Sequence, residues 1–534
     1  MWDSVGKWSI FAFFSALLLS PTSLVWGAWG CGDSADEENY VESDCSPSEA
    51  GASAIAHAKN LDPSCPPPSK KLGNQCVLNS DLVLTEPLIL KAYTKLNCQG
   101  HRLLPSGLTA APNVQSIPPV AIFSARASGV KIQNCVIGSE TQPFSYGIMI
   151  ADSKVDPNWD EGQLALRRNK VVGNEVYAAN IAIDLLQTDN SEVKDNNLTI
   201  FGNGFGVDMR RAAYDVVSNN FIRRIDSTYW LKTTYPGGAP VLAPTVFSSG
   251  IIEGTGPNPT ADFTFTVGSE TVTVAGIDPS QTAPNHHNFI EDNTIEMTGI
   301  LGRPASLTGF TINSGIQLED NVSGTEVRGN SISGDSTNPP ALGVFVGGAS
   351  TAPGFLVNNV LLEGNSVTGG FIRDAIQVFV ARNTTLRDNV LSDAGRSGVL
   401  LGSFGLESTT VTGNIISDNG INCALPFCTT AASGRGGFSF SRGTGPSNFA
   451  AFFGAEISLN DVTDNLRGVG VITLVPYTFP SELSVEGQGN YWGHSSAPGF
   501  TAADSSLYPL VKDSNPYCVP VAELDPALLP PTCP

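Results

Sequence analysis

Residues 375–401 read AIQVFVARNTTLRDNVLSDAGRSGVLL, and they span one turn of a repeat that recurs along most of the chain. The turn opens with a short apolar strand that begins with Ala or Gly. A polar stretch follows, and then a segment with the pattern apolar-x-x-Asn-x-apolar, here LRDNVL. The strand GVLL starts the next turn. Similar strands are GIMIADS, AIDLLQT, GVDMRRA, GIQLEDN and GVFVGGA.

The repeated asparagine sets the period. We assign it to Asn174, Asn196, Asn219, Asn293, Asn330, Asn365, Asn389 and Asn414. The close intervals are 22, 23, 24 and 25 residues, and the intervals of 74, 37 and 35 contain inserted residues. Leucine-rich repeats have a period in this range, but they require L-x-x-L-x-L, which is missing here.

Alternation within the strands indicates coils of short strands. In GIQLED, Ile316 and Leu318 point to one side while Gln317 and Glu319 point to the other, as a period of two requires. We therefore predict an all-β fold, a right-handed parallel β-helix with three strands in each coil of about 22–25 residues. An asparagine at each tight turn can bond the backbone of the next coil, so we expect the asparagines to form a structural ladder.

The ends and the loops divide the chain further. We expect a signal peptide over 1–30, a polar segment and cap over 31–80 with a capping helix at 46–61, the β-helix over 81–500, and a C-terminal tail and cap over 501–534. Insertions are expected at about 227–285, 335–356 and 421–450. The first contains FTFTVGSETVTVAG, whose alternation around Gly268 predicts a β-hairpin.

Composition excludes several classes of partner. The chain has 534 residues, and 29 Lys and Arg against 50 Asp and Glu give a net charge of −21. Binding to nucleic acid or to anionic membranes relies on Lys and Arg, so we expect neither. Beyond the N-terminal apolar stretch, no segment reaches the ~20 apolar residues of a membrane span.

The N-terminal stretch predicts export. Lys7, the apolar WSIFAFFSALLLS and the small residues near Ala28 are typical of a signal peptide. Gly30-Cys31 followed by a polar tract also resembles a lipoprotein junction, so a lipid anchor at Cys31 is the alternative to free secretion.

Ten cysteines suit an oxidising compartment, and none has zinc-site spacing. We expect local disulfides for two pairs, Cys423 with Cys428 and Cys518 with Cys533. Cys98 and Cys135 lie in similar contexts and are expected on neighbouring turns.

The C-terminal motif GNYWGHSSAPG (489–499) adds a resemblance. The chain resembles right-handed parallel β-helix repeat proteins of the pectate-lyase-like and NosD-like superfamily, many of which end in N-Y-W-G. The resemblance implies the fold, makes Trp492 an apolar plug on the last coil, and implies an association with carbohydrate. It carries over no catalytic residue, since the G-H-G and D-P-H-D signatures of sugar-modifying relatives are missing.

Aligning the strands aligns one outward column: Met149, Asp184, Asp208, Gln317, Phe345, Gln377 and Leu400. Asp184 and Asp208 should lie one rung apart with Arg210 beside them. Such a pair could act as an acid and a nucleophile, bind calcium as the one candidate cofactor, grip an acidic sugar, or form a solvated patch. We take Asp184, Asp208 and Arg210 as candidate catalytic residues.

Other side chains near this column are candidates for substrate binding, because aromatic rings flanked by charge suit sugars. They are Arg211, Arg223, Tyr229, Trp230, Phe345 and Phe379.

Three functions compete. The first is a secreted or surface protein that binds or modifies extracellular polysaccharide, as a lyase, hydrolase or epimerase if it is an enzyme. The second is a structural or adhesive solenoid without an active site. A NosD-like periplasmic accessory role is the third, but four Met and five His make copper handling implausible.

Overall fold

The computed structural model describes residues 65, 69–72, 75–106, 120–125, 129–151, 168–201, 204–225, 247–254, 263–268, 270–274, 285–299, 312–348, 356–402, 408–421, 436–442, 456–465, 469–473, 485–488, 490 and 511–513. All of them belong to one compact unit, Ser48–Pro534. The expected signal peptide, Cys31, the capping helix, Trp492 and the two local cysteine pairs lie outside the described residues.

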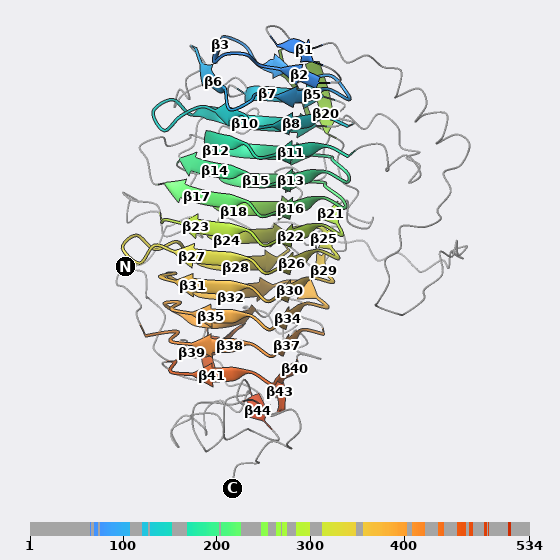
Figure 1. Cartoon of the computed structure of the whole chain (residues 1–534). Coiled ribbons are helices and arrows are strands. Elements are labelled where there is room, and N and C mark those ends of the chain that lie inside the picture. Colours follow the sequence, from blue (N-terminus) through green and yellow to red (C-terminus); the bar gives the residue numbers. More distant parts are fainter. Residues whose placement is uncertain are drawn as a thin grey trace, which may run out of the picture. The chain divides into compact units, whose positions relative to one another are not determined.

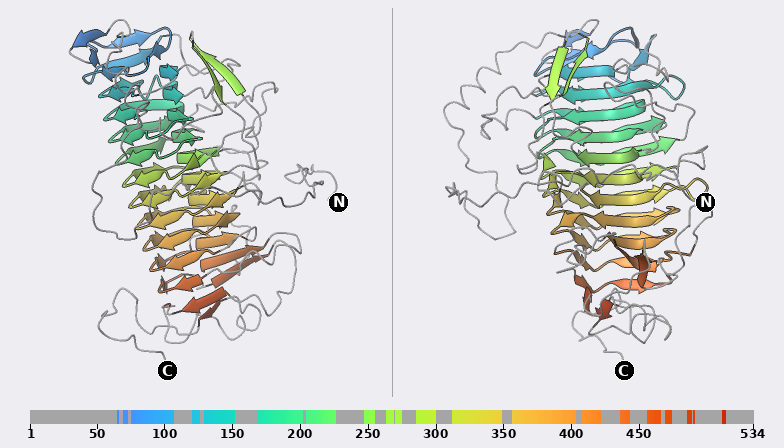
Figure 2. Two further views of the ribbon diagram at one scale, coloured as in Figure 1. Left: turned by 90° about the vertical axis from the view of Figure 1, so that its right-hand side faces the viewer. Right: turned by 180° about the vertical axis from the view of Figure 1, so that it is seen from behind.

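The chain is a right-handed parallel β-helix, as the repeat predicted. Each coil contributes strands to three faces, and equivalent strands of successive coils pair in parallel (Figures 1 and 2).

The strands of the long face are β4 (Leu88–Ile89), β7 (Val120–Ala125), β10 (Phe144–Ala151), β12 (Glu175–Leu186), β15 (Phe205–Arg210), β18 (Phe247–Gly254), β24 (Ile312–Glu319), β28 (Leu342–Gly347), β32 (Asp374–Phe379), β36 (Ser397–Gly402), β39 (Gly436–Arg442) and β42 (Val469–Thr473).

The short face shares β12 and adds β3 (Leu82–Leu84), β6 (Arg102–Pro105), β9 (Val136–Ile137), β14 (Asn197–Phe201), β17 (Phe221–Ile225), β23 (Thr294–Met297), β27 (Ser331–Gly334), β31 (Ser366–Gly369), β35 (Val390–Ser392), β38 (Ile415–Ser417) and β41 (Asp461–Thr463).

The third face consists of β1 (Lys70–Leu72), β2 (Gln75–Val77), β5 (Lys95–Asn97), β8 (Lys131–Gln133), β11 (Lys170–Val172), β13 (Glu192–Lys194), β16 (Val216–Ser218), β22 (Phe289–Glu291), β26 (Glu326–Arg328), β30 (Leu361–Glu363), β34 (Thr385–Arg387), β37 (Thr410–Thr412), β40 (Glu456–Ser458), β43 (Val485–Gln488) and β44 (Val511–Asp513).

Two small sheets complete the fold. Short strands beside the third face form one of them: β21 (Asn285–His286), β25 (Val322–Ser323), β29 (Val357–Asn358) and β33 (Ala381–Arg382). The other is the predicted hairpin, β19 (Phe263–Val267) with β20 (Glu270–Val274), which is antiparallel as expected.

The core lies between the three faces. Inward side chains of successive coils stack on one another, as in the column Ile183, Val207, Ile251 and Ile316, all essentially inaccessible to solvent. Burying one such side chain contributes roughly 1.5–3 kcal/mol, so the repeated column supplies much of the stability. Within the described residues there is no helix, and hence none with the length and apolar character of a membrane span.

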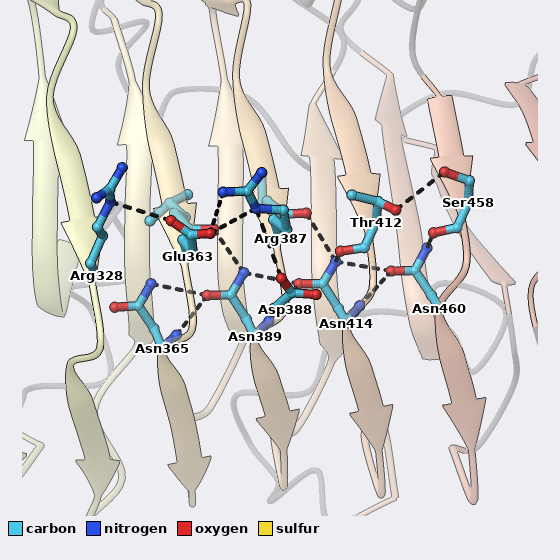
Figure 3. A network of polar contacts seen from close by, with 12 residues as sticks. Arg328, Glu363, Asn365, Arg387, Asp388, Asn389, Thr412, Asn414, Ser458 and Asn460 are labelled. Carbon is cyan, nitrogen blue, oxygen red and sulfur yellow. Dashed lines mark hydrogen bonds and ion pairs between the residues drawn. The ribbon is translucent and has the colours of Figure 1, made fainter. Parts of the chain in front are cut away.

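A ladder of asparagines runs along the turn between the third and short faces (Figure 3). Each Nδ2 donates to the Oδ1 of the next asparagine at 2.9–3.0 Å. The ladder comprises Asn174, Asn196, Asn220, Asn293, Asn330, Asn365, Asn389, Asn414, Asn460 and Asn490.

The prediction that Asn219 belongs to the ladder is wrong. Asn219 is exposed and has a φ of 54°, so it occupies the left-handed position that precedes each ladder residue, while its neighbour Asn220 makes the ladder bonds. Glycine holds the same left-handed position before Asn174, Asn330 and Asn365.

A disulfide joins the coils at the N-terminal end of the ladder. Cys98 and Cys135, expected on neighbouring turns, form a disulfide, and the Cys135 backbone N–H donates to Asn174 Oδ1 at 3.0 Å. A second disulfide, which the sequence did not predict, joins Cys65 to Cys76.

The three segments in which we expect insertions also take part in the coils. Each contains a strand of the long face: β18 in 227–285, β28 in 335–356 and β39 in 421–450.

Candidate functional site

The outward side of the long face carries the predicted column in register. Its members, in order along the solenoid, are Met149, Asp184, Asp208, Ile252, Gln317, Phe345, Gln377, Leu400 and Ser439. Asp184 and Asp208 are direct partners, as predicted. Ile252 separates Asp208 from Gln317, because β18 supplies a coil that the sequence alignment had placed in an insertion.

A second outward column lies two residues further along each strand. It runs Leu186, Arg210, Gly254, Glu319, Gly347 and Phe379. A Cβ at Gly254 would lie 2.8 Å from Cγ of Glu319, so the Glu319 side chain leans across this glycine toward Arg210. A Cβ would also lie 2.7 Å from the Glu319 backbone oxygen, so glycine gives the space for this close approach. We call Asp184, Asp208, Arg210, Gln317 and Glu319 the acidic cluster.

The two aspartates differ in their electrostatic state. Arg210 donates from Nε to Asp208 Oδ2 at 2.8 Å and forms an ion pair with the same carboxylate through Nη2. Burial raises the pKa of the Asp184 carboxyl to about 7, Arg210 opposes that rise, and the charge of Asp208 adds to it. Asp184 Oδ1 is buried and has no hydrogen-bond partner among the described residues. The pair therefore combines a carboxylate in an ion pair with a carboxyl whose pKa is raised to about neutral pH.

Further polar groups extend the cluster. Gln317 Nε2 donates to Glu319 Oε2 at 2.5 Å, and Gln317 Oε1 accepts from the hydroxyl of Ser249 at 2.8 Å. Burial raises the pKa of Glu319 to about 7, with a contribution from the negative charge of Asp320. On the other side of the pair, burial raises the pKa of Tyr146, on which the charges of Arg210, Asp184 and Asp208 also act.

Solvent reaches this cluster unequally. Asp184 and Asp208 are each 2% exposed. The Arg210 side chain is 19% exposed, and Tyr146 is half-buried. A ligand on this face would therefore meet Arg210 and Tyr146 first, with the two carboxyl groups beneath them.

The N-terminal end of the same outward surface is apolar and covered. The β19–β20 hairpin packs its Val267 and Val272 against Phe123 and Met149, and Phe265 makes an edge contact with Phe123 at 6.3 Å between ring centroids. Figure 2 shows this hairpin beside the first coils. It thus bounds the acidic cluster on one side.

The predicted substrate-binding residues lie in different parts of the chain's structure. Phe345 and Phe379 lie half-buried on the outward side of the long face. Arg211 is buried in a left-handed turn after β15. Arg223 lies on the short face, 3.8 Å from Glu140, and so does not join Asp184 and Asp208. Tyr229 and Trp230 fall outside the described residues.

Calcium, the candidate cofactor, would have to share the aspartate pair with Arg210. Arg210 already supplies positive charge to Asp208 at the position where a cation would compensate it. Within the described part of the chain, no three or more His, Cys, Asp and Glu side chains are arranged to hold a metal ion.

Comparison with solved structures finds likeness of fold. The periplasmic alginate epimerase AlgG superposes with a TM-score of 0.41 at 16% identity, covering 75% of this chain and 76% of that one. PfbA, a surface adhesin of Streptococcus pneumoniae, gives 0.37 at 11%, covering 78% of this chain and 79% of that one. The tailspike protein of E. coli bacteriophage HK620, solved with a pentasaccharide, gives 0.36 at 11%, covering 79% and 58%. No protein-family model and no curated protein matches the chain.

The sequence analysis did not identify two groups of polar side chains on this face. Tyr146 joins the acidic cluster from an outward position three residues before Met149, the first residue of the aligned column. Arg373 and Arg396 each lie one residue before the start of a strand, β32 and β36. Counting outward positions backward in steps of two from Gln377 and Leu400 reaches both arginines. The same count from Met149 misses Tyr146, because the register is irregular between Phe144 and Tyr146.

Proposed function

We propose that the protein binds and modifies extracellular polysaccharide on the outward side of the long face, with Asp184 as proton donor and Asp208 as the charged partner. The supporting observation is the pair itself: two carboxyl groups on neighbouring rungs, one in an ion pair with Arg210 and the other with its pKa raised to about 7. Pairs whose environments separate their ionisation are a recurring device of acid–base catalysis.

The spacing of the rungs supports sugar chemistry. Neighbouring parallel strands lie about 4.8 Å apart, and the carboxyl groups of retaining glycosidases are about 5–5.5 Å apart. In such a reaction the Asp184 O–H gives its proton to the glycosidic oxygen as the bond to the sugar carbon breaks. The Asp208 carboxylate stabilises the positive charge that develops on that carbon until the oxygen of a water molecule bonds to it and a proton of that water returns to Asp184.

The test is an activity screen of the mature chain against acidic and neutral polysaccharides. Reducing ends would report hydrolysis, absorbance of unsaturated uronates would report a lyase, and proton NMR of the product would report an epimerase. Asp184→Asn is the informative variant, because the amide keeps the shape of the protonated carboxyl but cannot donate an acidic proton. Arg223→Gln on the short face is the matched control.

We expect activity that Asp184→Asn abolishes and Arg223→Gln leaves unchanged. Silence of the wild-type chain across the panel, together with no retardation in polysaccharide affinity gels, would contradict the proposal. In that case the burial of both aspartates at 2% exposure would favour a structural or adhesive solenoid.

A further inference from the structure

A second polar cluster lies on the same outward surface, on β32 and β36. The register Asp208, Ile252, Gln317, Phe345, Gln377 places it four rungs from Asp208. At about 4.8 Å per rung, this is about 19 Å along the solenoid axis. The cluster is thus too far from the aspartate pair to contact the same sugar unit.

Only one of the two arginines of this cluster is paired with a carboxylate. Arg396 binds Asp374 with both arms of its guanidinium, and the Asp374 side chain is fully buried. Arg373 donates from Nη2 to Gln377 Oε1 at 2.9 Å and forms no ion pair among the described residues. Burial and the positive charge of Arg396 lower the pKa of Arg373 to about 10, with Asp374 opposing them. Arg373 therefore stays charged at neutral pH without a carboxylate of its own.

An excess cation at this place is notable in a chain of net charge −21. Removing a cation from water without a counter-charge is unfavourable, so a half-buried arginine of this kind gains from an anionic partner. Its planar fork suits a carboxylate or sulfate, which it can bind through two parallel hydrogen bonds. Because Gln377 Oε1 is engaged by Arg373, the Gln377 amide can donate to the same anion.

Aromatic rings lie beside and beyond Gln377, Phe345 on the neighbouring strand β28 and Phe379 two residues further along β32. Phe345 is the register partner of Gln377, and a Cβ at Gly347 would lie 2.9 Å from its Cζ atom. Phe379 lies over Gly402, where a Cβ would be 2.5 Å from its ring. The two glycines thus let both rings lie along the surface, half-buried, as a platform beside Gln377, which accepts the hydrogen bond of Arg373.

We propose that Arg373, assisted by Gln377, binds a carboxylate or sulfate group of a sugar chain that lies across Phe345 and Phe379. The proposal rests on the proposed function and specifies it, because it makes the ligand an acidic polysaccharide that runs along the solenoid axis past Asp184 and Asp208.

The first test uses small anions, so it does not depend on catalysis. Wild type, Arg373→Gln and Arg373→Lys would be titrated with sodium sulfate and sodium glucuronate, against sodium chloride at equal ionic strength, while the thermal midpoint is followed. Arg328→Gln, which removes an arginine paired with Glu326 and Glu363 on the third face, is the control (Figure 3 shows Arg328 and Glu363).

We expect sulfate and glucuronate to raise the midpoint of the wild type and of Arg328→Gln, and to leave that of Arg373→Gln unchanged. Arg373→Lys keeps the charge and loses the fork, so its response should be intermediate. In the absence of anion, Arg373→Gln should be at least as stable as the wild type, whereas a purely structural arginine would destabilise the fold when removed. Equal responses of wild type and Arg373→Gln would overturn the proposal.

A second test measures polysaccharide. Affinity electrophoresis with polygalacturonate, dextran sulfate and neutral dextran should show a 10–100-fold weaker interaction of Arg373→Gln with the charged polymers alone. If Asp184→Asn abolishes turnover while Arg373→Gln binds and turns over acidic polymers as the wild type does, the anion subsite is wrong and the proposed function stands. If the anions act through Arg373 while no polymer binds, the proposed function is wrong and the subsite stands.

Discussion

At the scale of single residues, position in the coil decides the role of a side chain more than its type does. Asn219 and Asn220 are adjacent and chemically identical, yet one is exposed in a left-handed turn and the other is buried in the ladder. Asp184 and Asp208 occupy equivalent places on neighbouring rungs, yet only Asp208 is paired with Arg210. The period of the sequence determines which residues form a column. The contacts that each residue makes with the neighbouring coil determine these differences.

The asparagine pair offers a direct test. Asn220→Ala removes an acceptor for the Asn196 side chain and a donor to Asn293, and it leaves buried groups unsatisfied. We expect a loss of about 2–3 kcal/mol in the free energy of unfolding, measured with urea. Asn219→Gly should change it by less than about 0.5 kcal/mol, because glycine accepts the left-handed conformation. A larger effect of Asn219→Gly than of Asn220→Ala would contradict the assignment of the ladder.

Asp184 gives a prediction about pH. A proton donor acts only while it holds its proton, so turnover should fall as pH rises through about 7, the raised pKa of Asp184. Asp184→Asn should lower turnover 10²–10⁴-fold and abolish this limb of the profile. Glu319→Gln is the control, since burial raises the pKa of Glu319 to about 7 as well. If the limb disappears in Glu319→Gln and persists in Asp184→Asn, the donor is Glu319.

At the scale of elements, β18 shows how a coil can hold an ionisable side chain inside the solenoid. Glu253 takes the inward position that Met209 and Leu318 hold on the adjacent strands. Its Oε1 accepts from Asn288 Nδ2 at 2.8 Å and from Thr325 Oγ1 at 2.9 Å. Burial raises the pKa of Glu253 to about 7, although both hydrogen bonds oppose the rise.

A second buried carboxyl behaves alike. Asp215, which precedes β16, accepts from the Ser191 backbone N–H at 2.7 Å and from Thr188 Oγ1 at 2.6 Å. Burial raises its pKa to about 8, and the charges of Asp189 and Glu253 contribute to the rise. Both carboxyl groups hold protons in the folded chain over a pH range in which the unfolded chain has lost them.

Stability should therefore decline with rising pH. A carboxyl with a raised folded pKa binds its proton more tightly in the folded state, so its contribution is complete below about pH 4 and is lost as pH rises to about 8. Urea unfolding of Glu253→Gln, whose amide mimics the protonated acid, should show a shallower decline between pH 5 and pH 8 than the wild type. The exposed Glu296→Gln should follow the wild type. Parallel curves for Glu253→Gln and wild type would contradict a protonated Glu253.

The sequence was sufficient to predict the repeating strands, but it was insufficient to predict the structure between them. Period and alternation predicted the three-faced coil and the pairing of Asp184 with Asp208, because both depend on residues about 23 positions apart. The coil of β18 was missed because long loops separate it from its neighbours. Burial of the outward column was missed because contacts such as that between β20 and β7 join segments about 150 residues apart, and no local pattern encodes them.

At the scale of the whole molecule, the outward surface of the long face changes character along the solenoid. The first coils are apolar and covered by the β19–β20 hairpin. The acidic cluster of Asp184 and Asp208 follows, and the aromatic and cationic cluster around Arg373 comes four rungs later. A rigid solenoid keeps this order and spacing fixed, so both clusters could bind one linear ligand at the same time.

Fixed spacing leads to a prediction about ligand length. An acidic oligosaccharide shorter than about 19 Å can occupy only one of the two clusters, whereas a longer one can occupy both. Once the first contact is made, the second is intramolecular, so affinity should rise in a step of at least 10-fold at that length. Calorimetric titration with size-fractionated oligogalacturonates would measure the step, and Arg373→Gln should remove it without weakening the shortest ligand that binds at Asp184. A smooth increase with length that is the same in both proteins would mean that the two clusters do not act on one chain.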